Sequence, residues 1–271
     1  MSTKLDIYTT KRRGRIKNML FTSACFLATI TCVLMLMGLI WNIIVQGKDW
    51  LSWGFIDHLP SRFPHKAGIK SALWGSIWLI SLTAMFSVPL GVGAAVYLEE
   101  YAPRSRWRKL IQLNIANLAG VPSIVYGILG LGLFVRALSL ERSVLSGALT
   151  LTLVVLPIII LASQEALRAV PDSIRRSAYA LGATRWQTVW YQVLPASLPG
   201  IMTGVILSLS RALGEAAPLI AVGAMAYVPF VPEKLTDEFT ALPIQIFNWT
   251  SRPQEDFHHL AAAGILVLLV V

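Results

Sequence analysis

The chain has 271 residues, of which 55% are hydrophobic and only 14% are charged, and its mean hydropathy is +0.64. This composition is typical of a membrane protein, and it predicts an all-α fold because a helix satisfies its own backbone hydrogen bonds in lipid. The formal net charge is +9. The cations flank apolar segments and form no groove, which argues against nucleic-acid binding.

The apolar segments predict about six transmembrane helices. Segments long enough to cross ~30 Å of hydrocarbon occur at 19–45, 71–98, 109–135, 144–164 and 196–224. A sixth begins at Leu260, where only 12 residues remain, fewer than the ~20 that a span needs. We therefore expect the given chain to stop within its sixth span.

The placement of charge predicts the orientation of the chain in the membrane. With the N-terminus inside, the inner segments hold 14 cations against five acids, whereas cations and acids balance in the outer segments. This is the positive-inside pattern. The first span lacks a clear cleavage site and is expected to be a retained anchor. The expected organisation is an inner N-terminal arm at 1–18, the first span with an external loop at 19–68, and one membrane domain at 69–271.

Two of the predicted spans contain unusual residues. The third is interrupted by Gly120-Val-Pro-Ser-Ile-Val-Tyr-Gly127, a sequence that is tolerated where backbone lines protein or a water-filled cavity. The fifth carries four polar residues, namely Ser208, Ser210, Arg211 and Glu215. Arg211 and Glu215 are four apart and are expected to pair. Either the pair is structural, or Arg211 offers a donor fork to an oxyanion that passes through the membrane.

The external segment 225–256 contains the string Leu242-Pro-Ile-Gln-Ile-Phe-Asn-Trp249. The string predicts a short re-entrant or interfacial element at an outer gate, and a solvated loop is the alternative.

The polar stretch 171–195, between the fourth and fifth spans, is the region around which we expect function to be organised. Asp172 is suited to cap a short helix that runs to Leu181, where Gly182 supplies a left-handed residue. A second capped helix is expected to follow at once. A loop that only joined two spans could be much shorter, so this one is expected to be gripped by another protein.

The second helix of this stretch is predicted to start at a capping box of Thr184 and Gln187 and to end at Pro195. Each helix is amphipathic. The first presents an apolar face of Ile174, Ala178 and Leu181, with Arg175 and Arg176 turned elsewhere. The second is expected to stack on one face Trp186, Val189, Trp190 and Val193.

The run RRSAYALGATRWQTVWYQVLPASLPG resembles the cytoplasmic EAA loop of ABC-importer permeases, whose pattern is Glu-Ala-Ala, three residues, Gly, nine residues, Ile-x-Leu-Pro. The matching residues are Ala178, Gly182, Leu194 and Pro195. The departures are Arg176, Ser177 and Gln192, so a cation stands at the usual Glu position. The runs LSRALGEAAPLI and FTALPIQIFNWTSRPQEDFHHLAAAG narrow the likeness to PstA-type permeases of phosphate importers, and the likeness extends from about Lys70 onward.

The resemblance implies a type I ABC importer permease fold over 69–271, with a cytoplasmic coupling-helix loop between spans 4 and 5. It implies ATP-driven import of inorganic phosphate across the bacterial plasma (inner) membrane. It favours a substrate pathway that includes Arg211, Glu215, Ser208 and Ser210, with Arg211 as the group that meets the oxyanion. The residues that it implies for coupling to an ATPase are Arg175, Arg176, Ser177, Ala178, Leu181, Gly182, Ala183, Thr184, Trp186, Trp190, Leu194 and Pro195.

The partners that the resemblance implies are a second, PstC-like permease, a PstB-like ATPase dimer and a PstS-like phosphate-binding protein outside the membrane, with membrane lipids around the bundle. The sequence contains no GxxxxGK[ST] loop and no HExxH or GxSxG motif, so we expect a transporter subunit that binds no cofactor, with ATP and Mg on the ATPase. The alternatives are a permease for sulfate or molybdate, a passive anion channel, and a membrane-embedded lipid enzyme.

Overall fold

The first helix, α1 (Ser2–Gly47), projects away from the rest of the molecule in this computed structural model, which describes residues 2–224 and 227–271. The charged arm and the first predicted span form one helix. Its C-terminal end packs against α12 (Glu255–Val270), and a Cβ on Gly47 would lie 2.7 Å from the backbone nitrogen of Ala263. This close approach places the end of α1 against the last helix.

A loop with three short helical turns, η1 (Lys48–Trp50), α2 (Trp53–Asp57) and η2 (Pro64–Lys66), leads to the second long helix. This helix, α3 (Lys70–Val96), continues without a break into a π-helical turn, η3 (Tyr97–Tyr101). Pro89 lies inside α3. The second predicted span is therefore confirmed and reaches Tyr101.

The third predicted span is not one helix but two, which meet at an angle of 98°. The chain forms α4 (Arg106–Ala119), then α5 (Ser123–Gly130), which runs on as a π-helical segment, η4 (Leu131–Ala137). The predicted interruption is thus confirmed, and it bends the chain far more than a kink. Pro122 has no N–H to donate, which favours the end of α4 near this point.

The centre of the bundle is α6 (Val144–Ala169), which packs against α3 on one side and α9 (Leu194–Leu213) on the other. Small residues let α6 and α9 approach closely. A Cβ on Gly204 would lie 2.5 Å from the Cβ of Ala162, and one on Gly200 would lie 2.9 Å from that of Ala166. Such seams are typical of helix packing in membranes.

The fifth predicted span is also broken. The helix α9 ends at Leu213, and a separate helix, α10 (Ala217–Val222), follows the turn 214–216. Pro218 explains the break, because it lacks the N–H of a continuous helix and its ring clashes with the carbonyl four residues earlier. The fifth predicted span is therefore confirmed as the helical segment Arg185–Leu213, whereas residues 214–224 of the predicted segment form a separate turn and helix.

The last part of the chain packs against the start of α3. The helix α11 (Leu242–Thr250) contacts both α12 and α3, and Trp249 is buried beside Phe55. The expected element at 242–249 is thus a helix, and residues 225 and 226 of the predicted external segment lie outside the described residues. In the part of the chain that the structure describes, only an isolated bridge between Ser143 and Glu238 has β character.

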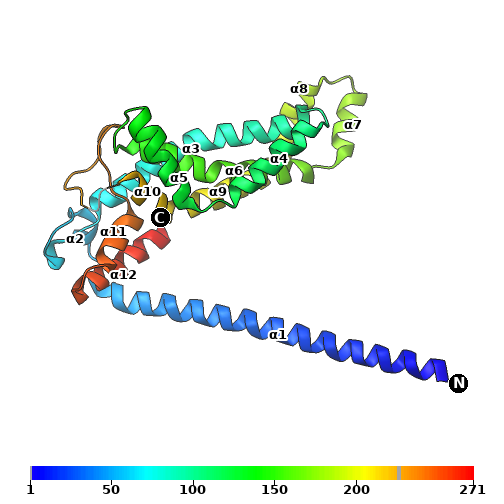
Figure 1. The fold of residues 1–271 in the computed structure, drawn as a ribbon, viewed down its shortest axis with the longest axis horizontal. Helices are drawn as coiled ribbons and strands as arrows, with labels where there is room; N and C mark the ends of the chain where they lie inside the picture. The colour runs from blue at the N-terminus through cyan, green and yellow to red at the C-terminus, as the bar shows by residue number, and fades with distance from the viewer. Residues whose placement is uncertain (1, 225–226) are drawn as a thin grey trace.

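Within the described residues, four helices are long and apolar enough to cross a membrane, and the bent pair α4–α5 adds a fifth. These five correspond to the first five predicted spans. The helix α12 corresponds to the sixth apolar segment. Figure 1 shows the N-terminus and α7 (Asp172–Ala180) toward the same end of the long axis.

Candidate functional site

The turn between α7 and α8 (Arg185–Thr188) is built largely as its residues predict. Gly182 has φ +84°, the left-handed conformation that glycine adopts without strain. Thr184 and Gln187 form the predicted capping box, in which each side chain binds the backbone N–H of the other residue. Asp172 does not cap α7, because Pro171 occupies the cap position and Asp172 is the first helical residue.

Pro195 does not end the second helix. The helix α8 continues through a π-helical turn, η5 (Val189–Val193), into α9, so that 185–213 is one continuous segment. Pro195 lies in the first turn of α9. The wider π turn relaxes the backbone hydrogen-bonding pattern just before a residue that donates no hydrogen bond.

The apolar residues of this segment divide between two faces, contrary to the prediction of a single face. Val189 and Val193 are buried, and Val193 packs against Leu167 and Val170 at the end of α6. Trp186 and Trp190 stack on each other with ring centroids 5.5 Å apart, and they remain 60% and 51% exposed. The π turn accounts for the division, because it shifts the register of side chains around the helix.

A second apolar surface lies on α7. A groove of 350 Å³ is lined by Ser173, Ile174, Ser177, Ala178, Leu181 and Gln192. It contains the three residues of the predicted apolar face of this helix. Leu181 is 89% exposed at the tip of the turn. The α7–α8 turn therefore presents a leucine, a groove and a tryptophan stack that no described residue covers.

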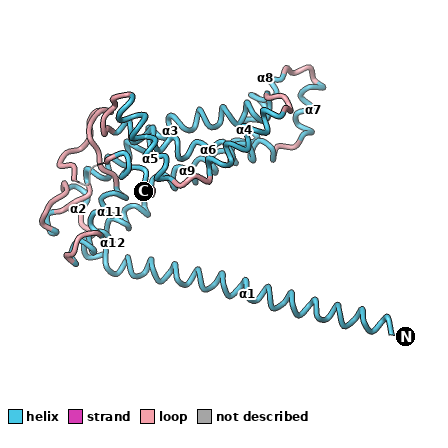
Figure 2. Tube along the Cα trace, viewed as in Figure 1, coloured by secondary structure: helices cyan, strands magenta, loops and turns pink. Residues whose placement is uncertain are grey.

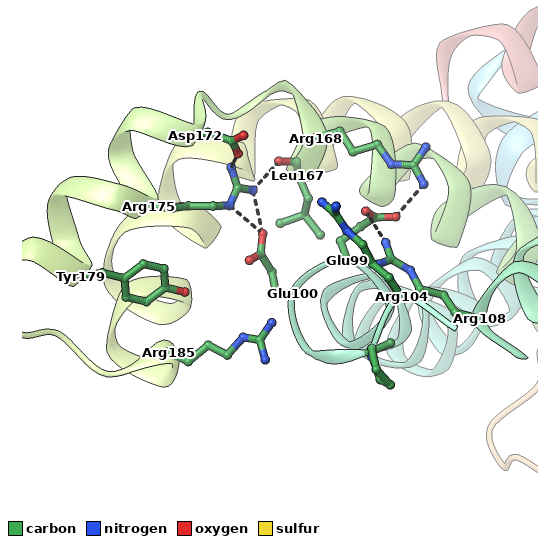
Figure 3. A pocket seen from close by; sticks show the side chains of 12 residues that line it. Glu99, Glu100, Arg104, Arg108, Leu167, Arg168, Asp172, Arg175, Tyr179 and Arg185 are labelled. Atoms are coloured by element: carbon green, nitrogen blue, oxygen red, sulfur yellow. Dashed lines mark hydrogen bonds and ion pairs between the residues drawn. The ribbon is translucent and has the colours of Figure 1, made fainter. Parts of the chain in front are cut away.

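Arg175 is turned away from the apolar face of α7, as predicted, and it points into the protein toward Glu100 (Figure 3). Its Nε and Nη2 donate to Oε1 of Glu100 at 3.1 and 2.6 Å. It also donates to the carbonyls of Leu167 and Val170 at 2.9 and 2.7 Å. Since the last carbonyls of a helix lack intrahelical donors, Arg175 both caps the end of α6 and ties α7 to η3.

Glu99 forms a second junction beside the first. Its carboxylate accepts from Arg168 Nη2 at 2.6 Å and from Arg108 Nη2 at 3.0 Å, and it is only 10% exposed. These bonds join η3 to the end of α6 and to the first turn of α4. Together the two adjacent glutamates connect α3, α4, α6 and α7 at one end of the bundle (Figure 3).

Sequence reasoning did not include Glu99, Glu100, Arg108 or Arg168 among the site residues. The sequence does contain a signal for these ion pairs, because two adjacent acids end an apolar span in a region where cations dominate. Buried carboxylates need paired donors, so these two acids could have been expected to bind arginines.

The remaining residues predicted for coupling lie in this same part of the structure. Arg176, Ser177 and Thr184 are exposed, whereas Ala183 and Leu194 are half-buried. The two predicted helices of the loop thus lie together and form one surface. The side chain of Arg175 is not part of this surface, because it points inward to Glu100.

The four polar residues predicted in the fifth span lie in different environments. Arg211 and Glu215 form the predicted ion pair at 3.2 Å, but Arg211 lies in the last turn of α9 and Glu215 in the turn that follows. Their side chains are 59% and 18% exposed. Ser210 is exposed near Arg211, whereas Ser208 is buried and donates to the Gly204 carbonyl at 2.7 Å.

Within 18–224 and 227–271, no group of three or more His, Cys, Asp or Glu side chains is arranged to hold a metal ion. The site consists of helix termini, ion pairs and exposed apolar side chains. These are features of a surface that binds a partner and transmits its position to several helices.

An all-helical bundle of apolar spans with a capped, amphipathic turn at one end defines a membrane permease. Residues 87–271 match the family described as "Binding-protein-dependent transport system inner membrane component". The chain belongs to this family, and it is therefore an inner-membrane component of a transport system that depends on a binding protein.

Several relatives are similar over most of the chain. The phosphate transport system permease protein PstA 1 of Mycobacterium tuberculosis is 33% identical over 96% of this chain and 86% of its own length. The phosphate transport system permease protein PstA of Yersinia pestis is 33% identical over 86% of this chain and 81% of its own. The probable ABC transporter permease protein YqgI of Bacillus subtilis is 35% identical over 76% of this chain and 70% of its own length.

The fold is similar to that of a solved importer. A chain of the MetNI methionine ABC transporter, in an inward-facing conformation, matches with a TM-score of 0.60 at 17% identity. The match covers 73% of this chain and 88% of that one. The chain thus has the type I ABC importer permease fold that its sequence predicts.

Proposed function

We propose that this chain is the permease subunit that carries inorganic phosphate across the membrane in an ATP-driven importer. The observation that carries the proposal is the similarity to phosphate permeases, which extends over 96% of the chain. As a permease component, the chain is a transporter subunit rather than an enzyme, and we propose that ATP and Mg bind a separate ATPase.

We propose alternating access as the mechanism, with the α7–α8 turn as the element that the ATPase grips. Leu181 and the Trp186–Trp190 stack offer apolar contacts, and the groove on α7 offers a recess for a partner side chain. Closure of the ATPase dimer moves α7, and the bonds of Arg175 to Glu100 and to α6 carry this motion to the spans.

The finer partners that we propose are a PstC-like second permease, a PstB-like ATPase dimer and a PstS-like binding protein. We also propose that the N-terminus and the α7–α8 turn are cytoplasmic. The positive-inside distribution of charge supports this orientation, and so does the position of the N-terminus toward the same end as α7 (Figure 1).

For the substrate pathway we propose a route past Arg211. Its guanidinium is held at one nitrogen by Glu215 and is more than half exposed, so most of its donors are free to bind an oxyanion. Ser210 lies on the exposed side of the same helix turn. Ser208 is predicted to lie on the same route, but its buried hydroxyl donates to the Gly204 carbonyl, which makes it the weakest member of that set.

The test is uptake of radiolabelled phosphate into vesicles that contain the complete complex and its binding protein. We expect Arg211→Gln to reduce uptake at least about tenfold, as loss of a charged contact in the pathway requires. Arg62→Gln, which removes the same charge from an exposed loop, is the matched control. Unchanged uptake by Arg211→Gln makes the Arg211–Glu215 pair structural.

The same vesicles distinguish phosphate from other oxyanions. An excess of unlabelled phosphate should abolish labelled uptake, whereas sulfate or molybdate at the same concentration should leave it unchanged. Strong competition by sulfate overturns the phosphate assignment and favours a broader oxyanion permease.

A further inference from the structure

A cavity of 530 Å³ lies beside the two glutamate junctions, where η3, α4, α6 and α7 meet (Figure 3). Glu99 and Glu100 line it together with five arginines, which come from the loop before α4 and from α4, α6, α7 and α8. A volume of this size is in the range that holds small-molecule ligands.

The cavity has more positive than negative side chains. Five arginines line it against three acids, and Arg168 also pairs with Glu165 outside the lining, so one guanidinium charge remains uncompensated. Arg108, Arg168 and Arg175 are engaged by the two glutamates. Arg104 and Arg185 also line the cavity, and neither forms an ion pair with another described residue.

An unsatisfied donor provides a second observation. The Nε of Arg108 is buried and has no hydrogen-bond partner, although its Nη2 binds Glu99. A buried donor without a partner is costly, and a bound acceptor in the cavity would relieve this cost. Tyr179 contributes a further hydroxyl-bearing side chain to the lining.

We infer that this cavity binds a phosphate group, held by the lining residues Arg104 and Arg185, with Arg108 as a further donor. Guanidinium forks match the oxygens of a phosphate group in two-bond geometry, and the single negative charge of a phosphate monoanion or of a phosphodiester headgroup balances the spare charge. The glutamates do not prevent binding, because Arg108 and Arg168 already neutralise Glu99 and Arg175 neutralises Glu100.

Two sources can supply such a group, namely the headgroup of an anionic lipid and free phosphate in solution. The position favours the headgroup. The lining residues 99–108 begin where the apolar span Lys70–Tyr101 ends, which is the depth of the headgroups. Tyr97 and Trp107, which are 58% and 74% exposed, suit the same interface. The inference does not depend on which ion the complex transports.

The test is native mass spectrometry of the complete purified complex, titrated with phosphatidylglycerol. The variant is Arg104→Gln combined with Arg185→Gln. Its control is Arg106→Gln combined with Lys109→Gln, which removes the same charge from exposed positions of α4 that do not line the cavity. We expect the variant to bind the lipid about tenfold or more weakly, and the control to differ from wild type by less than about twofold.

A second arm adds inorganic phosphate to the lipid-bound complex. Retention of the lipid identifies the headgroup as the ligand. Displacement of the lipid that depends on Arg104 and Arg185 identifies free phosphate as the ligand. Either result supports the site. Equal weakening in variant and control overturns the inference, because it shows diffuse surface charge. Binding that appears only after the ATPase subunits are removed also overturns it, since the cavity is then covered by a protein.

Discussion

Arg175 is the residue on which the end of the bundle depends most. It is 17% exposed, and it binds a carboxylate that is 7% exposed. A buried pair of this kind contributes little net stability, because both charges lose water, but removal of one partner leaves the other charge unpaired. Its value is that it joins three segments, α6, α7 and η3, in a fixed relation.

Glu100→Gln is therefore expected to lower the free energy of unfolding by about 3 kcal/mol, since Arg175 keeps its charge and loses its buried counter-ion. Asp172→Asn is the matched control. Asp172 is also paired with Arg175, but at 3.5 Å and with a side chain that is 77% exposed. Its loss should cost no more than about 0.5 kcal/mol.

The measurement is chemical unfolding of the purified complex in detergent, followed by helical signal. The same two variants should differ in transport, with Glu100→Gln impaired more than Asp172→Asn. Equal destabilisation by both substitutions would show that Arg175 is an ordinary surface arginine, contrary to its position in the structure.

At the scale of elements, the turn at Gly182 sets the angle between α7 and α8. A side chain at φ +84° costs about 1–2 kcal/mol. We expect Gly182→Ala to reduce phosphate uptake and to raise ATP hydrolysis per ion transported, because the turn moves away from its native geometry. Open space surrounds this position, so a steric clash is not the cause.

Gly93→Ala is the control for this substitution. Gly93 lies inside α3 with nothing within 4 Å of an added Cβ, and alanine is a better helix former than glycine. Its uptake should match wild type. If both variants behave alike, the left-handed conformation at Gly182 has no role in coupling.

The loop before α11 contains a titratable contact. The carboxylate of Asp237 accepts from the backbone N–H groups of Glu233 and Lys234 at 2.9 Å each, and these bonds lower the pKa of Asp237. Because the folded pKa is lowered, the contact stabilises the loop at neutral pH and is lost as the pH falls through that value.

We therefore expect the amides of Glu233 and Lys234 to lose protection against hydrogen exchange in acid, after correction for the intrinsic pH dependence of exchange. Asp237→Ala, which removes the acceptor, should show low protection at all pH values. Protection that does not change between neutral and acidic pH would mean that the carboxylate does not hold this loop.

At the scale of the molecule, hydrophobic length and charge placement were enough to predict a helical membrane protein and its orientation. The capping box at Thr184 and the left-handed Gly182 were also predictable, because short-range backbone chemistry determines them. The resemblance of 175–200 and of the later runs to known permeases added the transport class, and the family match agrees with it.

Breaks and long-range contacts were less predictable. Pro195 continues a helix while Pro218 begins a new one, and the difference arises from the π turn that precedes the first. The burial of Arg175 depends on Glu100, which lies 75 residues earlier. No local pattern gives such a contact, because it is created by the packing of α3 against α6.

In the proposed mechanism, the exposed tryptophan stack on the α8–α9 segment couples ATP hydrolysis to phosphate movement. The most direct test is the number of phosphate ions imported per ATP hydrolysed in proteoliposomes that contain the complete complex. Trp190→Ala removes half of the stack, and Trp107→Ala, which removes a 74% exposed tryptophan from α4, is the control.

We predict that Trp190→Ala lowers this ratio at least about tenfold, as loss of an aromatic anchor at an interface does, while the complex stays assembled and Trp107→Ala keeps the wild-type ratio. A Trp190→Ala complex that imports phosphate and hydrolyses ATP in the wild-type ratio would contradict the assignment of this segment as the coupling element.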